Sequence, residues 1–111
     1  MTLDALRAYG ANTAEGVARC MNNEQFYLRM VAMALADKNF DALTAAMDAG
    51  DVTAAFEAAH ALKGSIGNVS LSPIYSPLCE LTELLRGKSM PEGGRALLEQ
   101  IVSEREKALR L

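Results

Sequence analysis

The sequence has only one histidine in 111 residues, so any chemistry that requires an imidazole has to take place at His60. It has two cysteines, Cys20 and Cys79, which are far apart and lack both C-x-x-C and zinc-ligand spacing. We interpret both as buried free thiols, which suits the reducing cytoplasm. The cysteines therefore predict neither a disulfide framework nor a metal site.

Long apolar runs and a strong excess of one charge are also missing. The longest apolar run, from Met30 to Ala36, is far too short to span a bilayer, and Asp4 interrupts any signal-peptide hydrophobic segment. The formal net charge of -3, from 14 acidic and 11 basic residues, gives no basic footprint for nucleic acid. We therefore expect a cytoplasmic protein that binds neither membrane nor nucleic acid.

No nucleotide-binding or metal-binding pattern is complete. The sequence has no G-x-x-x-x-G-K-[ST] loop and no acidic cluster that would hold magnesium. Glu57 and His60 form an E-x-x-H pair, the spacing found in carboxylate-bridged di-metal bundles, but such a site needs a second pair and further inward-facing glutamates. One histidine cannot build that site within a monomer, so we expect no cofactor or metal of the chain's own.

What the sequence does contain is the periodicity of a wholly helical protein, with no convincing strand and no helical repeat. Four principal helices are predicted, from Asn23 to Lys38, Val52 to Val69, Pro73 to Arg86 and Pro91 to Leu111. Shorter helices are predicted around Leu3 to Tyr9, Asn12 to Met21 and Phe40 to Met47. We expect a single domain, residues 1–111, with an all-α fold: an up-and-down four-helix bundle with additional short N-terminal helices.

Caps and prolines indicate where some of these helices begin. Asn12, followed three residues later by Glu15, resembles a capping box. Ser72 is expected to cap the next-to-last helix, with Pro73 at its first helical position. Pro77 either restarts this helix or kinks it, and the sequence leaves both alternatives open.

Two groups of side chains are interpreted as structural rather than functional. The helix from Asn23 carries a methionine and aromatic stripe that we assign to the core, namely Phe26, Met30, Met33 and Leu35. The last helix carries a polar face that we assign to solvent, namely Glu104, Arg105, Glu106 and Lys107.

His60 is predicted to point away from the core. At about 100° per residue, one face of its helix gathers the apolar residues Val52, Ala55, Ala59, Leu62, Ile66 and Val69. His60 falls on the other side, together with Thr53, Phe56, Glu57, Lys63, Gly64 and Gly67. A glycine inside a helix costs about 1 kcal/mol relative to alanine. Because neither glycine lies on the apolar face, we interpret both as clearance for a large partner.

Lys63 follows His60 by three residues and shares its helix face. A neutral imidazole has a nitrogen lone pair that can attack phosphorus, and a lysine ammonium can hold the phosphoryl oxygens by charge-assisted hydrogen bonds. The candidate catalytic residues are therefore His60, as phosphoacceptor, and Lys63, for stabilisation of phosphoryl charge. The candidate partner-docking residues are Gly64, Gly67, Phe56, Thr53, Glu57 and Asn68.

The run HALKGS, from His60 to Ser65, resembles the H-x-L-K-G-[SA] signature of histidine-containing phosphotransfer (HPt) domains of bacterial and eukaryotic phosphorelays. The resemblance covers nearly the whole chain in length, helix succession and position of the histidine. One departure is Ser70, since family members often carry a glycine ten residues after the histidine. The departure concerns local geometry near the helix exit more than the phosphoacceptor.

The resemblance implies a phosphorelay intermediate without autokinase activity, and therefore not an enzyme that uses ATP. His60 would accept a phosphoryl group from the aspartate of a response-regulator receiver domain, or from the receiver of a hybrid histidine kinase, and pass it to another receiver. The receiver would bring the magnesium ion. We expect a monomer, and the starting methionine and self-contained helix set favour a free-standing protein. The alternative is a non-catalytic helical docking module that binds a signalling partner through the His60 face.

Overall fold

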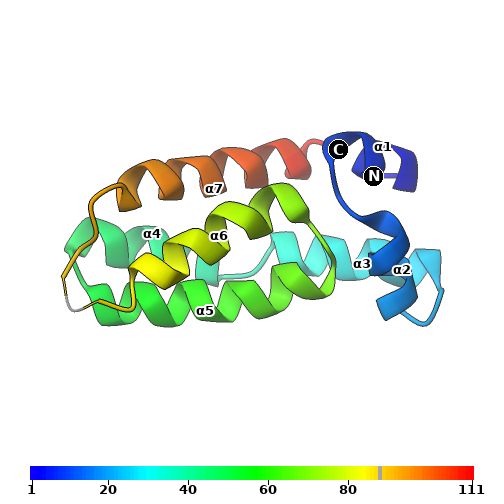
Figure 1. Cartoon of the computed structure of the whole chain (residues 1–111). Helices are drawn as coiled ribbons and strands as arrows, with labels where there is room; N and C mark the ends of the chain where they lie inside the picture. The colour runs from blue at the N-terminus through cyan, green and yellow to red at the C-terminus, as the bar shows by residue number, and fades with distance from the viewer. Residues whose placement is uncertain (88) are drawn as a thin grey trace.

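The computed structural model describes residues 1–87 and 89–111, and within them helices are the only regular secondary structure (Figure 1). The helices are α1 (Leu3–Tyr9), α2 (Thr13–Arg19), α3 (Glu24–Leu35), α4 (Asn39–Ala49), α5 (Val52–Asn68), α6 (Ser72–Leu84) and α7 (Gly94–Leu109). The expectation of an all-α helical bundle is confirmed.

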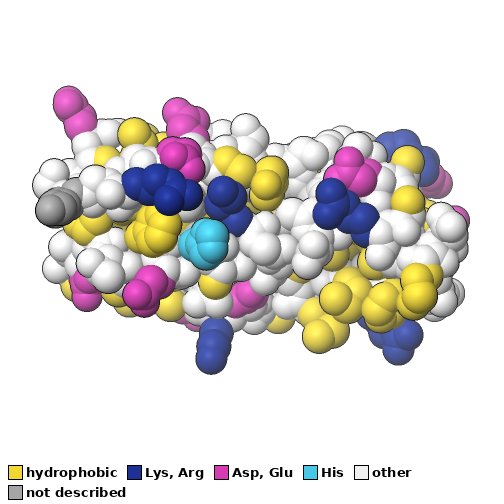
Figure 2. Space-filling model, turned by 60° about the horizontal axis from the view of Figure 1, so that its bottom comes forward, with side chains coloured by type: hydrophobic (Ala, Val, Ile, Leu, Met, Phe, Trp, Pro, Cys, Tyr) yellow, Lys and Arg dark blue, Asp and Glu magenta, His cyan; other side chains and the backbone are white. Residues whose placement is uncertain are grey.

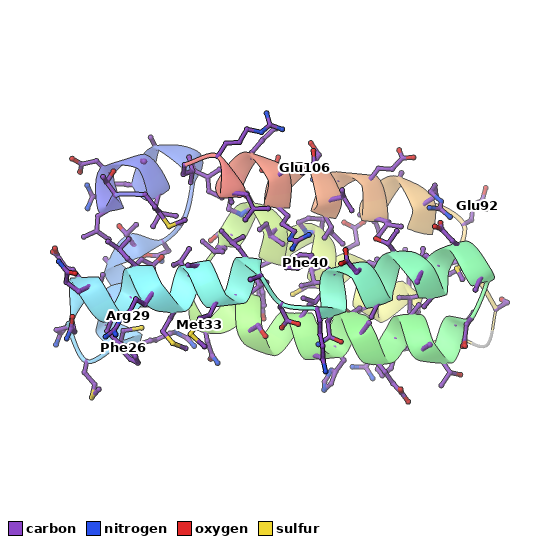
Figure 3. All side chains as sticks on the ribbon, turned by 180° about the vertical axis from the view of Figure 1, so that it is seen from behind. Phe26, Arg29, Met33, Phe40, Glu92 and Glu106 are labelled. Atoms are coloured by element: carbon purple, nitrogen blue, oxygen red, sulfur yellow. The ribbon has the colours of Figure 1, made fainter. Side chains whose placement is uncertain are left out.

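The bundle is elongated, with extents of 42 × 22 × 19 Å. α4 packs most extensively against α5, α5 also packs against α6, and α6 packs against α7. α3 and α4 lie end to end, so that together they form one long edge of the bundle (Figures 1 and 3). α4, predicted as one of the short helices, is the main packing partner of α5, whereas α3, predicted as one of the four principal helices, packs against α5 much less.

α3 ends at Leu35, three residues before the predicted end, because the next residues turn the chain into α4. The Asp37 carboxylate accepts hydrogen bonds from the backbone N–H of Asn39 at 2.8 Å and from its side-chain amide at 3.0 Å. A short acidic side chain that binds nearby backbone groups in this way competes with the helical ladder. The edge of the bundle is therefore made by two helices with a break at Asp37.

The predicted apolar face of α5 is the face that packs in the core. Ala55, Ala59, Leu62, Ile66 and Val69 are buried, and Val52 is half-buried. The core also contains large, fully buried side chains from the rest of the chain, namely Leu6, Tyr27, Leu35, Leu43, Leu71, Ile74, Leu78, Leu81, Leu85 and Ile101. One side of α5 is therefore buried in the core, and the other side is at the surface.

The assignment of the methionine and aromatic stripe of α3 to the core is wrong for Met33, whereas Leu35 lies in the core and Phe26 and Met30 pack against it. Leu35 is buried, but Phe26 and Met30 are only half-buried and Met33 is 66% exposed. Figure 3 shows Phe26 and Met33 along the same side of α3, and Met33 lines a surface pocket together with Ser65 and Asn68. α3 has apolar residues around most of its circumference, and its fully packed side consists of Leu35 together with Tyr27, Val31 and Ala34.

The polar face of α7 is not wholly solvent-facing, as the sequence had suggested. Arg105 is half-buried, its Nε donates to the backbone oxygen of Leu35 at 2.8 Å, and its guanidinium lies 4.4 Å from the centre of the Phe40 ring. α7 is also bonded to α1, because the Tyr9 hydroxyl donates a hydrogen bond to the backbone oxygen of Glu104 at 3.0 Å. α7 is thereby fastened both to the α3–α4 junction and to α1.

α6 runs through Pro77 as one helix, so the proline does not restart it. The helix begins with Leu71 at the cap position and no side-chain cap, which corrects the assignment of Ser72 as the cap. α7 begins at Gly94, three residues after the predicted Pro91. Both cysteines are free, but only Cys20 is buried and Cys79 is half-buried. Within residues 1–87 and 89–111, no helix is both long and apolar enough to cross a membrane.

Candidate functional site

His60 lies at the middle of α5, with its side chain exposed. The helix starts at a cap formed by Asp51, whose carboxylate accepts a hydrogen bond from the backbone N–H of Ala54 at 3.1 Å. Ala59 and Leu62, which lie close to His60 in the sequence, are fully buried. Burial of this apolar face fixes the rotation of α5 about its axis, and His60 therefore points outward. Figure 2 shows the imidazole (cyan) at the open surface, between hydrophobic and basic side chains.

On the N-terminal side of His60, an aromatic ring and a guanidinium come together. The rings of Phe56 and His60 are stacked, with centroids 5.9 Å apart and an interplanar angle of 12°. Arg86, just beyond the end of α6, places its guanidinium carbon 5.2 Å from the centre of the Phe56 ring. Phe56, Thr53 and Arg86 also line a surface groove of about 640 Å³.

On the C-terminal side, Lys63 is half-buried and lines a surface pocket of about 290 Å³ together with Gly64 and Arg19. The pocket is also lined by Glu15, whose carboxylate lies 3.3 Å from the Arg19 guanidinium. A Cβ atom added at Gly64 would meet nothing within 4 Å. The surface next to Lys63 is therefore open at Gly64, as the sequence analysis expected.

Gly67 has a different role from the one expected. A Cβ atom there would lie 3.0 Å from Cε1 of Tyr75, a residue of α6. Gly67 therefore lets the Tyr75 ring approach α5 closely, and the interpretation that helix packing does not explain this glycine is wrong. The remaining candidate docking residues, Thr53, Glu57 and Asn68, are exposed. Asn68 lines the pocket beside Lys63.

Ser65, the last residue of the signature run, forms a contact that the sequence analysis did not find. Its hydroxyl donates to Oδ2 of Asp37 at 2.7 Å, which ties α5 to the α3–α4 junction. Burial opposes ionisation of Asp37, but hydrogen bonds from the Asn39 backbone, Ser65 and the Asn39 side chain together lower the pKa of its carboxyl below the usual value. No spacing in the sequence connects two residues so far apart.

Ser70 adopts the backbone conformation that usually selects glycine, with φ of 54°. Its hydroxyl donates to Glu15 Oε1 at 2.9 Å, and its backbone oxygen accepts from the N–H of Asn12 at 3.0 Å. Half of the predicted capping box is present, since the Asn12 side chain accepts from the Glu15 N–H at 3.2 Å. The Glu15 side chain is instead hydrogen-bonded to Ser70, and the left-handed turn is kept without a glycine.

The side chains of the described residues contain no cluster of three or more His, Cys, Asp or Glu groups that could hold a metal ion. The surroundings of His60 are the stacked pair Phe56 and Arg86 on one side, and Lys63 with the open surface at Gly64 on the other. Arg86 was missed by the sequence analysis, because its place beside Phe56 depends on how α6 packs against α5.

The structure is thus a helical bundle that displays its histidine on the outer face of its longest helix, α5. The family model described as Hpt domain matches residues 28–109, and the chain belongs to that family. The matched segment includes all of α5, and membership implies histidine phosphotransfer in phosphorelays. Hpt domains are phosphotransfer modules without kinase activity. Comparisons with curated proteins and with solved structures found no match.

Proposed function

We propose that His60 accepts a phosphoryl group from the aspartate of a receiver domain and passes it to the aspartate of another receiver. The observation that carries this proposal is the exposed imidazole of His60 on α5, inside the segment that matches the Hpt domain. His60 is also the only histidine in the chain. A phosphohistidine formed by this protein can therefore only be formed there.

The transfer is an in-line displacement at phosphorus. A nitrogen lone pair of the neutral imidazole attacks the phosphorus of the aspartyl phosphate, so that a P–N bond forms. The P–O bond to the aspartyl carboxylate breaks, and the carboxylate leaves with the electron pair. The ring then loses a proton from its other nitrogen to solvent. The reverse sequence, with a second receiver, returns the phosphoryl group to a carboxylate.

The surroundings of His60 fit this reaction. Lys63 would hold phosphoryl oxygens by charge-assisted hydrogen bonds from the turn that follows His60. Gly64 leaves room for the receiver, with Phe56, Thr53, Glu57 and Asn68 at the rim of the docking surface. The partner would supply the magnesium ion, so this chain needs no cofactor of its own. We further propose that the protein acts as a monomer in the cytoplasm.

The test is phosphoryl transfer from phosphorylated receiver domains encoded in the same genome, followed by intact mass. We expect one acid-labile phosphoryl group on the wild-type protein, its transfer to a second receiver, and no modification of His60→Gln. If no receiver exchanges phosphoryl groups with His60, the transfer role is wrong. A His60→Gln variant that still supports signalling would instead indicate a docking module without chemistry.

A further inference from the structure

Two side chains of α5 and the Arg86 side chain just beyond α6 form a continuous stack that ends at His60. The Arg86 guanidinium lies over the Phe56 ring at 5.2 Å, and the Phe56 ring lies nearly parallel to the His60 ring at 5.9 Å. Ring centroids about 4.5–7 Å apart in an offset arrangement are the favourable geometry for aromatic pairs. Figure 2 shows basic and hydrophobic side chains directly beside the imidazole.

An exposed histidine on a helix surface is not held by core packing and can exchange between side-chain rotamers. Phe56 lies one helical turn before His60, where its ring can support one conformation of the imidazole. Phe56 is itself half-buried and lies in a groove with Val52 and Leu85. The ring that supports His60 is therefore better anchored than His60.

Arg86 is anchored in turn by α6. Its Nε donates to both carboxylate oxygens of Glu83, at 3.0 and 3.1 Å. Because a guanidinium is planar and rigid, this bond limits the positions that the group can take over Phe56. α6 therefore contributes, through Arg86 and Phe56, to the geometry of His60 on α5.

We propose that Phe56 and Arg86 are positioning residues for His60, which hold the imidazole in the conformation that attacks phosphorus. The inference rests on the proposed transfer function and extends it to two side chains that need not contact the phosphoryl group. Restriction of a nucleophile to its reactive geometry lowers the entropic part of the barrier. The role differs from that of a docking residue because it persists when no receiver is bound.

The experiment uses phosphoramidate as phosphoryl donor, since a small donor reports on His60 without receiver docking. The P–N bond of phosphoramidate breaks and ammonia leaves as the ring nitrogen bonds to phosphorus. Initial rates are measured for the wild type, Phe56→Leu, Phe56→Tyr and Arg86→Gln. The ring-proton resonances of His60 are recorded by NMR for the same proteins. Circular dichroism confirms that each variant is folded.

The chain supplies a matched control. The Arg29 guanidinium lies 5.9 Å from the centre of the Phe26 ring, and both residues belong to α3 (Figure 3). Arg29→Gln removes the same charge and the same kind of cation–π contact, but away from His60. We expect its rate and its His60 resonances to equal those of the wild type.

We expect Phe56→Leu to slow phosphorylation by roughly two- to tenfold, which corresponds to the loss of one aromatic pair. Arg86→Gln should slow it by roughly two- to fivefold, as for an exposed cation–π contact. Both variants should shift the His60 ring resonances. Phe56→Tyr should have the wild-type rate and the wild-type resonances, because it keeps the aromatic ring.

If Phe56→Leu and Arg86→Gln leave the rate at the wild-type value, the positioning role is overturned, even where the resonances move. A Phe56→Tyr variant as slow as Phe56→Leu would also overturn it. These results would leave the proposed function intact, because wild-type His60 would still be phosphorylated. A wild-type protein that gains no phosphoryl group on His60 from phosphoramidate or from any receiver would overturn both.

Discussion

Lys63 is the cation on α5 that lies one turn beyond His60, and it is half-buried beside the pocket that contains Gly64. Lys63→Ala should slow transfer from a phosphorylated receiver by about tenfold or more, the usual effect of losing a charge-assisted hydrogen bond. The reason is that phosphoryl oxygens would lose their ammonium partner. Single-turnover transfer at fixed receiver concentration measures the effect.

The control for this prediction is Lys107→Ala, which removes an equal charge from α7, where Lys107 is paired with Glu104 at 3.1 Å. Circular dichroism should show both variants folded. Equal rates for Lys63→Ala and the wild type would take away the role assigned to Lys63.

Ser65 and Asp37 give a residue-scale prediction on the pH dependence of stability. The pKa of Asp37 is lowered in the folded protein, so the stability that this carboxylate contributes is present above its unfolded pKa of about 3.9 and is lost as pH falls through the folded pKa. Ser65→Ala removes one of the hydrogen bonds that cause this shift. It should lower the free energy of unfolding by about 1 kcal/mol at pH 7, and by less below about pH 4.

Urea unfolding of Ser65→Ala and the wild type between neutral and acidic pH measures the difference directly. A gap between the two proteins that stays constant or widens as pH falls would contradict the assignment of the hydrogen bond to an ionised Asp37. Asp37→Asn offers a second check, since its stability should depend less on pH across the same range.

Single-residue chemistry was only partly predictable from the sequence. The outward direction of His60, the nearby Lys63 and the open space at Gly64 follow from helical periodicity alone. Arg86 and Asp37 could not be predicted, because each reaches α5 through tertiary packing. The left-handed backbone conformation of Ser70 could not be predicted either, since it occurs together with a hydrogen bond to Glu15, which is distant in the sequence.

At the scale of the element, the two glycines of α5 should respond differently to alanine. Gly64→Ala should raise the free energy of unfolding by about 1 kcal/mol, because alanine is the better helix former and its methyl group meets nothing. Gly67→Ala should raise the free energy of unfolding by less, because the new Cβ atom would lie 3.0 Å from the Tyr75 ring, which must then shift. Urea unfolding of the two variants compares them, and equal gains would contradict the packing role of Gly67.

The same element gives a functional contrast. Gly64→Gln places a long side chain on the open surface beside Lys63. It should block transfer from a receiver while leaving phosphorylation by phosphoramidate nearly unchanged, because only the receiver needs clearance. Normal transfer from a receiver to Gly64→Gln would refute the clearance argument.

Helix existence was easier to predict than helix boundaries and partners. α5 was predicted from Val52 to Val69 by its apolar face and runs from Val52 to Asn68, with Asp51 as its cap. α3 was predicted three residues too long at its C-terminal end, and Met33 was assigned to the core although it is exposed, because α3 is apolar around most of its circumference. The importance of α4 was underestimated, since which helix packs against α5 is decided by the chain reversal at Gly50 and Asp51 rather than by helix length.

For the whole molecule, the main question is whether α1 and α2 belong to the same cooperative unit as the bundle. Both helices precede the segment that matches the Hpt domain. They are nevertheless joined to it, since Leu6 is fully buried, the Tyr9 hydroxyl bonds to the backbone of α7, and Asn12 bonds to Ser70. Gly16 lies so close to Tyr27 of α3 that a Cβ atom would overlap its ring.

These contacts predict that a cavity made in α1 will destabilise the entire protein. Leu6→Ala should lower the global free energy of unfolding by about 2–5 kcal/mol, the usual cost of truncating a buried leucine. Native-state hydrogen exchange should show the loss in the slowest amides of α5 as well as in α1, because the core is shared. Tyr9→Phe is a smaller change that removes only one hydroxyl, and it should lower the free energy of unfolding by about 1 kcal/mol. If Leu6→Ala speeds exchange in residues 1–22 alone and leaves the amides of α5 unchanged, the N-terminal helices form a separate unit and the expectation of a single domain is wrong.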